Sequence, residues 1–562
     1  MPDYDVIISA GTVVDGTGAP PRSADVAIVD GRIVEVGAVD GTATRVIDAD
    51  GAVVTPGFVD IHTHYDGQAT WDSSLAPSSW HGVTTVVMGN CGVGFAPVHP
   101  HDHQRLIELM EGVEDIPGAA LHEGLSWEWQ SFPEYLDAVE RVPHDIDVGA
   151  QVPHGAVRLH VMGERGANRE SATAEEIAAM GAIAREAIEA GALGFSTSRT
   201  LNHRTSRGEP TPTLTASEDE LVGIAAAVGE SGMGVFEVVS DFLEFETEFT
   251  TLRRMVEASG RPLSISLVQS RRREDWRSLL GAIEAAAAEG LPIKGQVGAR
   301  PIGVVLGVEA SLNPFMRYAG WAELAPLDTA QRVALLRDPL FRERLLAEDA
   351  ALAPAAEHIF DIGDPPDYEP PPEASIAAEA ARRGVRAEEL VYDLLLQDDG
   401  RHLLYYPIFN YVDGNLDALR HMLMSEHTVA GLGDGGAHVG TICDGSYPTT
   451  MLTHWARDRV RGERLELPLV VRRQTRDTAQ AVGLGDRGVL AAGMRADVNV
   501  IDFDGLRLRP PEMHFDLPAG GKRLLQRADG YLHTFVAGVE TYADGIHTGA
   551  LPGQLVRGAR SA

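Results

Sequence analysis

The chain has 562 residues, more than one ordinary hydrophobic core accommodates, so we expect two domains or one barrel with large additions. Its formal net charge of −35 argues against nucleic-acid binding, which requires a positive surface. The sequence contains no apolar run of about 18 residues, which argues against a transmembrane helix, and its start lacks the basic region of a secretory signal. We therefore expect a cytoplasmic protein with a small-molecule partner, either monomeric or a homo-oligomer.

The two cysteines, Cys91 and Cys443, are few for a secreted chain of this length, which favours a reducing compartment. Both lie beside glycine-rich segments, so we favour a role in a site over a disulfide, with a buried inert thiol as the alternative. Lysine is rare: only Lys294 and Lys522 occur, and nearly all positive charge is arginine.

Short β-rich runs lie at both ends of the chain, at residues 6–8, 12–14, 26–29, 32–36, 496–501 and 531–536. Between two of these runs, Asp30-Gly31 is typical of a type I′ hairpin turn, whose residues need positive φ. We expect residues 1–55 and 487–562 to form one small β-sandwich.

The middle of the chain alternates between helical and strand patterns. Thr173 with Glu176 and Ser217 with Glu220 have the spacing of helix capping boxes. Helices are predicted from 173 to about 191, from 217, over 246–258 and over about 274–289, with strands at 193–196, 234–238, 263–267 and 293–297. Such repetition indicates an α/β protein with a parallel sheet, and we predict a (β/α)8 TIM-type barrel over residues 56–486. A doubly wound sheet is the alternative, but no glycine-rich dinucleotide turn follows a first strand.

This alternation of helical and strand patterns stops between about residues 301 and 404. The segment 364–372 carries five prolines, which remove backbone donors and fix φ, so regular structure is not expected there. An insertion of this size in a barrel usually covers the catalytic face. We interpret 301–404 as a lid, with a passive solvent-exposed insertion as the alternative.

Two histidines end the first strand of the predicted barrel. Alternation along a strand points His62 and His64 to the same side, where two imidazoles can share one metal ion. A His-x-His pair alone is a weak signal in a chain with 20 histidines. Its position after a buried strand, residues 55–61, makes it a strong one.

At this point the chain resembles the amidohydrolase superfamily, and within it the D-aminoacylase (N-acyl-D-amino-acid deacylase) branch. The matching segments are 55–68, Trp71-Asp72, 81–92, 191–196 and 493–497. The resemblance implies a (β/α)8 barrel with a small β-sandwich, and hydrolysis of an amide bond by metal-activated water.

The resemblance also implies roles for single residues. Cys91 matches the cysteine that this branch uses as a metal ligand, and Asp434 matches the aspartate that contacts metal and acts as general base. The carbamylated lysine that bridges two metals in many superfamily members is not available on the early strands, because no lysine precedes Lys294. A thiolate can replace it, since zinc binds sulfur well. For Cys91 and Asp434 the alternatives are a buried thiol and an Asx turn.

One departure from the branch affects the metal site. The branch has a histidine at the end of the fifth and of the sixth strand, whereas here no histidine occurs between His203 and His358. Three outcomes follow: one metal ion on the early histidines and Asp434, with or without Cys91; replacement of a lost histidine by Glu237; or a metal-poor, inactive site. We favour one ion over two, with zinc as the expected metal and other divalent ions as alternatives.

Candidates for substrate binding are weaker. Arg300 ends a predicted strand and could bind a carboxylate; His154 and Arg158 follow another and resemble a stretch of the deacylase branch; His438 follows Asp434. The alternative for each arginine is a surface or interdomain ion pair.

We therefore predict a hydrolase of non-peptide carbon–nitrogen bonds, with N-acyl-D-amino acids as the leading substrate class and cyclic amides or imides as the alternative. From a different class, the chain could be a metal-poor barrel that binds a ligand without catalysis. The joint presence of His62, His64, Cys91 and Asp434 argues against that reading.

Overall fold

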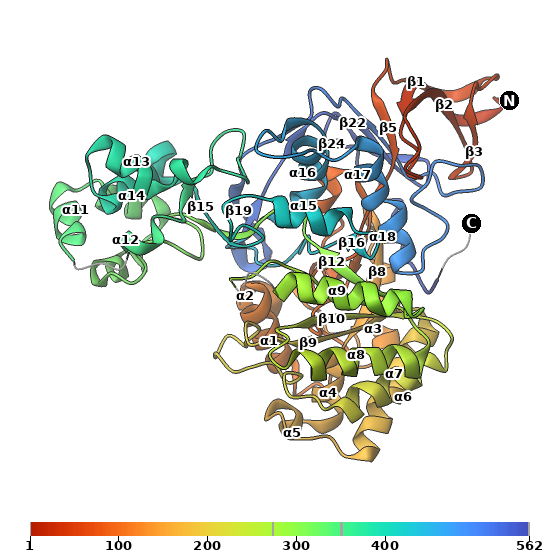
Figure 1. The fold of residues 1–562 in the computed structure, drawn as a ribbon, viewed down its shortest axis with the longest axis horizontal. Coiled ribbons are helices and arrows are strands. Elements are labelled where there is room, and N and C mark those ends of the chain that lie inside the picture. Colours follow the sequence, from red (N-terminus) through yellow and green to blue (C-terminus); the bar gives the residue numbers. More distant parts are fainter. Residues whose placement is uncertain (1, 272–274, 349–351, 560–562) are drawn as a thin grey trace.

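Eight parallel strands form the central sheet of the computed structural model, which describes residues 2–271, 275–348 and 352–559 (Figure 1). They are β6 (Phe58–Asp60), β7 (Val83–Met88), β8 (Asp147–Pro153), β9 (Gly194–Arg199), β10 (Val235–Ser240), β11 (Leu263–Ser266), β12 (Ile293–Val297) and β16 (Thr428–Ala430). Each strand pairs with its neighbour in chain order from β6 to β12, and β16 pairs with β12. The (β/α)8 barrel prediction is confirmed.

The barrel closes beyond the ends of its first and last strands. Thr63 and Gly435 form an isolated parallel bridge, the N–H of Asp434 donates to the carbonyl of His62, and the N–H of His64 donates to the carbonyl of Gly435. This seam joins the segment after β6 to the segment after β16. It sets the two histidines of the first strand beside Asp434 of the last.

Helices surround the barrel. The bounds of the longer ones are α1 (His103–Glu114), α3 (Phe132–Arg141), α4 (His154–Met162), α6 (Ala174–Ala190), α7 (Glu218–Gly229), α8 (Phe245–Ser259), α9 (Asp275–Ala288) and α15 (Asp417–Met424). Thr173 and Glu176 form the predicted capping box, whereas Ser217 caps α7 alone. The predicted start of α9 at Glu274 lies outside the described residues. No helix in the described part of the chain is long and apolar enough to cross a membrane.

The two ends of the chain share one sheet, drawn at the upper right of Figure 1, in the order β24-β23-β22-β17-β5-β1-β2-β3, with β4 beside β1. Its strands are β1 (Tyr4–Val13), β2 (Arg22–Val29), β3 (Arg32–Gly37), β4 (Ala43–Asp48), β5 (Val53–Pro56), β17 (Val498–Ile501), β22 (Tyr531–Val536), β23 (Val539–Ala543) and β24 (Ile546–His547). Asp30 and Gly31 both have positive φ, as the hairpin turn requires. The runs predicted at 6–8 and 12–14 are one strand, because β1 continues through an irregular register between Ile8 and Gly11.

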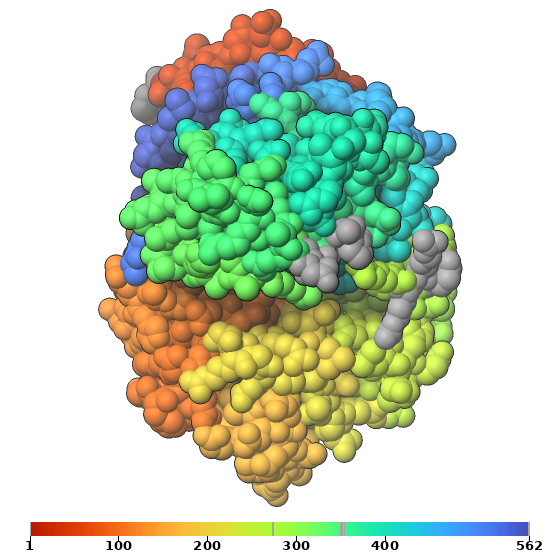
Figure 2. Space-filling model, turned by 90° about the vertical axis from the view of Figure 1, so that its left-hand side faces the viewer, coloured from red at the N-terminus to blue at the C-terminus, as the bar shows by residue number. Residues whose placement is uncertain are grey.

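Residues 302–409 leave the barrel after β12 and project to the left in Figure 1. They contain β13 (Ile302–Leu306), α10 (Thr329–Leu336), α11 (Pro339–Leu346), α12 (Leu352–Ala355), β14 (Phe360–Asp361), α13 (Ile376–Arg383), α14 (Ala387–Leu395) and β15 (Leu404–Phe409). The insertion has a hydrophobic core of its own, built around residues such as Phe315 and Tyr392. Figure 2 shows a hollow between the insertion, in green, and the orange and yellow segments of the barrel.

The loop 438–441, which follows Asp434, is held by three separate parts of the chain. The N–H of His438 donates to the carbonyl of Glu114 at the end of α1. Ser311 and Val305 of the insertion donate their N–H groups to the carbonyls of Gly440 and Thr441. In addition, the N–H of Leu524, in β20 (Gly521–Leu525), donates to the carbonyl of Val439.

Candidate metal centre

His62, His64 and Cys91 form a buried cluster at the carboxyl end of the barrel strands. One ligand atom from each of the three lies within 4.8 Å of the other two, the one such group in the described residues. Nε2 of His62 lies 3.4 Å from Sγ of Cys91. The histidines follow β6 and the cysteine follows β7, so neighbouring parallel strands deliver all three side chains to one edge of the sheet.

Asp434, which follows the last strand, lies beside this cluster. Its Oδ1 lies 3.5 Å from Nε2 of His62 and 3.7 Å from Nε2 of His64. Burial alone would raise the pKa of Asp434, but the nearby imidazoles of His64, His62 and His438 outweigh it and lower that pKa well below its usual range. The group is therefore a carboxylate at neutral pH.

A hydrogen bond fixes the orientation of His62. Its Nδ1 lies 2.9 Å from Oε1 of Gln296 on β12, and an amide oxygen only accepts. His62 therefore carries its proton on Nδ1 and turns the lone pair of Nε2 toward Cys91 and Asp434. The amide nitrogen of Gln296 donates in turn to Oγ of Ser264 on β11, which holds the amide in this orientation.

Glu237 lies inside the same buried cluster. Its Oε2 accepts the backbone N–H of Cys91 at 2.9 Å, while its buried Oε1 has no hydrogen-bond partner. Burial raises the pKa of Glu237. Burial, followed by the charges of Glu237 and Glu114, raises the pKa of the Cys91 thiol well above its usual value. A cation at this point would offset the repulsion among these acidic groups.

Sequence reasoning missed two residues at this centre. Glu114, the last residue of α1, is 1% exposed, with Oε1 3.3 Å from Nδ1 of His64 and Oε2 3.6 Å from Nε2 of His438. The spacing from Ile107 and Met110 puts Glu114 on the apolar face of the helix, a signal that could have identified it. His203, in the loop after β9, is the other: its pKa is lowered to about 3 by burial and by the nearby His438 and His64.

The structure does not bring Arg300, His154 or Arg158 to this cluster. Arg300 is buried, donates from Nε to Asp444 at 2.8 Å and stacks on Tyr368. The geometry therefore gives no support to its predicted binding of a substrate carboxylate.

His154 and Arg158 share a different carboxylate, that of Glu220 on α7. Helix α4 begins directly after β8, so these side chains turn outward between α4 and α7 rather than toward the barrel mouth. Arg158 is therefore in an ion pair, as its alternative has it, but the pair is buried rather than at the surface. His438, by contrast, does lie at the cluster, through its contact with Glu114.

Cys443 also lies away from the cluster. It is buried, its thiol contacts the carbonyl of Leu524, and burial raises its pKa to about 12, as expected for an inert thiol.

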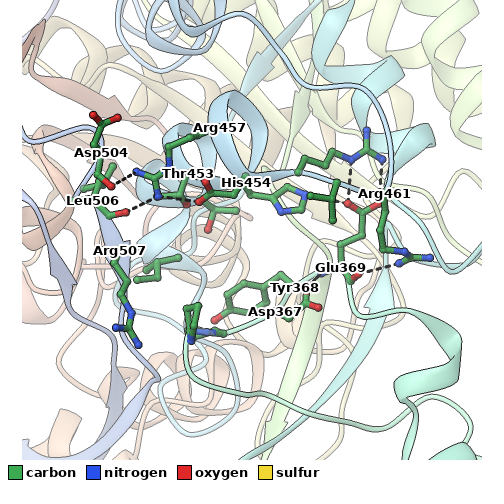
Figure 3. Close-up of a pocket in the computed structure, with 18 residues that line it drawn as sticks. Asp367, Tyr368, Glu369, Thr453, His454, Arg457, Arg461, Asp504, Leu506 and Arg507 are labelled. Carbon is green, nitrogen blue, oxygen red and sulfur yellow. Dashed lines mark hydrogen bonds and ion pairs between the residues drawn. The ribbon is translucent and has the colours of Figure 1, made fainter.

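A cavity of about 660 Å³ lies between the insertion, the helical segment 450–458 and residues 504–508 (Figure 3). Its lining includes none of the clustered ligand residues. Arg459 and Arg461 in its wall are already bound within the chain, Arg459 by the carboxylate of Glu369 and Arg461 by backbone carbonyls including that of Glu369. These contacts attach the insertion to the barrel.

Comparison with known proteins identifies the family. The model of the amidohydrolase family matches residues 45–542, which is most of the chain. The chain belongs to the amidohydrolase family. It is a hydrolase of carbon–nitrogen bonds other than peptide bonds, as the sequence predicts, and the predicted resemblance to the D-aminoacylase branch is confirmed by its relatives.

Among these relatives, N-acyl-D-glutamate deacylase of Alcaligenes xylosoxydans xylosoxydans is 30% identical over 513 residues, covering 89% of this chain and 88% of its own. D-aminoacylase of the same organism is 36% identical over 195 residues, 34% of this chain and 37% of its own.

Two solved structures are similar over nearly the whole amidohydrolase. A D-aminoacylase structure, described as having a binuclear metal centre with one-metal activation and second-metal attenuation, is 26% identical, with a TM-score of 0.66, covering 99% of this chain and 100% of its own. N-acyl-D-glutamate deacylase of Bordetella bronchiseptica, complexed with zinc and a phosphonate inhibitor, is 25% identical, with a TM-score of 0.64 and 99% of each chain covered.

Proposed function

We propose that this amidohydrolase binds one zinc ion through His62, His64 and Cys91, with Asp434 beside the fourth position, which is left open to water. The observation that carries the proposal is the spacing of the donor atoms. Four ligands at tetrahedral positions around zinc, with bonds of about 2.0–2.3 Å, lie about 3.3–3.8 Å apart. Nε2 of His62 and Sγ of Cys91 are 3.4 Å apart, which agrees with that spacing, and one ligand atom from each of His62, His64 and Cys91 lies within 4.8 Å of the other two. Oδ1 of Asp434 lies 3.5 Å from Nε2 of His62 and 3.7 Å from Nε2 of His64, so it is within reach of a water at the fourth position.

Asp434 has the geometry and charge of a general base. Zinc in this position would supply Lewis-acid chemistry, polarising the acyl carbonyl and acidifying the attacking water. The lowered pKa of Asp434 keeps its carboxylate ionised, so it can accept the proton of that water. The same carboxyl group then delivers the proton to the departing amine, which leaves as a neutral group.

A single ion also agrees with the residues on the fifth and sixth strands. Glu237 is the one acidic side chain within β10 and β11, and one of its oxygens already accepts the N–H of Cys91. We assign Glu237 to the orientation of the Cys91 loop rather than to the ion. The structure of the similar D-aminoacylase is described as showing one-metal activation, which supports the proposal that one ion is sufficient for activity here.

N-acyl-D-amino acids are the proposed substrates. Relatives named for deacylation of N-acyl-D-glutamate and N-acyl-D-aspartate, together with D-aminoacylase, support this class. Two imidazoles are placed to contact such a substrate: His438, whose side chain is 25% exposed, and His203, held at Nδ1 by Oγ of Ser198 at 2.9 Å.

We further propose a lid role for residues 301–404, a β-rich unit formed by residues 1–55 and 487–562, and a cytoplasmic location. The insertion leaves the barrel at the end of β12, on the same side as the metal centre, and it contacts the loop that follows Asp434.

Both cysteines are free thiols, which agrees with a reducing compartment. The net charge of −35 favours a small-molecule partner over nucleic acid.

A substrate panel tests the proposed reaction. Zinc-loaded protein would be assayed for amine release from matched N-acyl-D- and N-acyl-L-amino acids, with cyclic imides as a third group. We expect hydrolysis of the D series and at least tenfold lower kcat/KM for the L series, a difference of about 1.4 kcal/mol in transition-state binding. Hydrolysis confined to the cyclic imides would replace this substrate class, and hydrolysis of none would refute the proposal.

A further inference from the structure

Glu114 is a buried carboxylate that the proposed reaction does not use. Its carboxyl oxygens lie between two imidazoles, 3.3 Å from Nδ1 of His64 and 3.6 Å from Nε2 of His438. Neither Nδ1 of His64 nor Oε1 of Glu114 makes a hydrogen bond in the structure, although the two atoms are 3.3 Å apart, and both residues are 1% exposed. A buried carboxylate is costly unless it is paired, so this position calls for an explanation.

The surroundings of His62 supply that explanation. His62 presents Nε2 to the centre because its Nδ1 bonds to an oxygen of Gln296 behind it. His64 has a related arrangement without the hydrogen bond: Nε2 lies near Asp434, while Nδ1 lies 3.3 Å from an oxygen of Glu114. The two histidines thus each have an oxygen acceptor on the side away from the centre, an amide in one case and a carboxylate in the other. Acceptors of this kind set the tautomer and ring orientation of metal-binding histidines.

We propose that Glu114 is a positioning residue that holds His64 with its proton on Nδ1 and its Nε2 lone pair toward the metal. The inference rests on the proposed function, because it concerns a ligand of the proposed zinc site. Glu114 itself does not touch the ion or the substrate in this assignment.

The backbone around Glu114 ties the same contact to the loop after the last strand. The carbonyl of Glu114 accepts the N–H of His438, and the next side chain, Asp115, accepts the N–H of Gly440 at 3.2 Å. The end of α1 therefore contacts both the ring of His64 and the loop that contains His438. A displaced Glu114 would disturb metal affinity first, through His64, and substrate binding second, through His438.

Zinc affinity of metal-free protein tests the assignment. Zinc binding would be measured by competition with a chromophoric chelator for wild type, Glu114→Leu, Glu114→Gln and the control Glu108→Leu. Leucine keeps the buried volume and removes the acceptor, whereas glutamine keeps an oxygen of the kind that Gln296 offers to His62. Glu108 lies on the same helix but pairs with the exposed Arg207.

We expect Glu114→Leu to bind zinc about 10- to 100-fold more weakly than wild type. Glu114→Gln and Glu108→Leu should remain near wild type, and the far-UV circular dichroism and melting temperature of the metal-free proteins should be similar. The visible spectrum of cobalt-substituted Glu114→Leu should change as well, because the ligand field at the ion reports the orientation of His64.

Wild-type affinity in Glu114→Leu, or an equal loss in Glu114→Gln, would overturn the positioning role while leaving the proposed function intact. Failure of the wild type to bind zinc would overturn both. Should Glu114→Leu not fold, Glu114→Ala gives the same comparison with the glutamine variant.

Discussion

The N–H of Asp434 donates to the carbonyl oxygen of His62 with an N···O distance of 3.0 Å. This one bond spans 372 positions of sequence and closes the barrel where the first and last strands meet. It also sets the Asp434 carboxylate 3.5 Å from Nε2 of His62. Barrel closure and assembly of the site are therefore the same structural event.

Asp434→Asn is expected to lower kcat by about 100- to 10,000-fold, because an amide cannot accept the proton of the attacking water. The backbone bond to His62 does not involve the side chain, so the fold should be retained. Steady-state kinetics and thermal melting would be compared with wild type. A variant with near-normal kcat would eliminate Asp434 as the base.

Removal of metal with a chelator is expected to abolish activity, and zinc addition should restore it. Elemental analysis of purified wild type should give about one equivalent of a divalent transition metal, since the donor set fits one tetrahedral ion. A content below about half an equivalent that added zinc does not raise would contradict the metal-dependent reaction.

Glu237→Gln is expected to retain about one equivalent of zinc, because the glutamine oxygen can still accept the N–H of Cys91. The measurement is metal content after gel filtration in zinc-free buffer. A loss of more than half of the metal would instead make Glu237 a ligand, the replacement for a missing histidine considered above.

Arg300→Ala is expected to destabilise the protein by about 3–5 kcal/mol, because it leaves the buried Asp444 carboxylate without its partner. The KM of any surviving folded enzyme should be unchanged, since the guanidinium lies against Tyr368 and not in the metal centre. Urea unfolding and steady-state kinetics separate the two effects. A large rise in KM with full stability would restore Arg300 as a substrate-binding residue.

Acid sensitivity is expected to depend in part on His81. Burial lowers the pKa of His81 from 6.5 to about 4 in the folded protein. The unfolded chain therefore binds a proton below about pH 6.5 that the folded chain does not, so this stability is present above that pH and is lost as pH falls toward 4. Between about pH 7.5 and pH 5 the loss amounts to about 2 kcal/mol.

His81→Gln should remove that share of the pH dependence while costing some stability at every pH. Urea unfolding of metal-free protein at the two pH values gives the comparison, and the absence of metal keeps ligand protonation out of it. Equal pH dependence in the variant and the wild type would show that His81 does not contribute.

Local pattern was enough to predict much of the fold. His62 and His64 follow from strand alternation, and the capping box at Thr173 marks a helix where the structure has one. The insertion was recognised by its prolines, but its helices and separate core were not predicted, because they arise from packing within the insertion.

The site was predicted less completely, for a physical reason. Arg300 and His154 end strands as catalytic residues do, yet their side chains are directed by partners far along the chain, Asp444 and Glu220. Such partners are invisible to local pattern. Glu114 was overlooked for the opposite reason: a charge on the apolar face of a helix was detectable, but only the fold places it behind His64.

The loop 438–441 has a consequence for how the enzyme matures. Its backbone partners come from residues near 114, from the insertion near 305–311 and from Leu524. Until Leu524 has left the ribosome, this loop lacks one of its backbone partners. The surroundings of His438 should therefore be completed later in synthesis than the cluster of His62, His64 and Cys91, whose residues all precede residue 92.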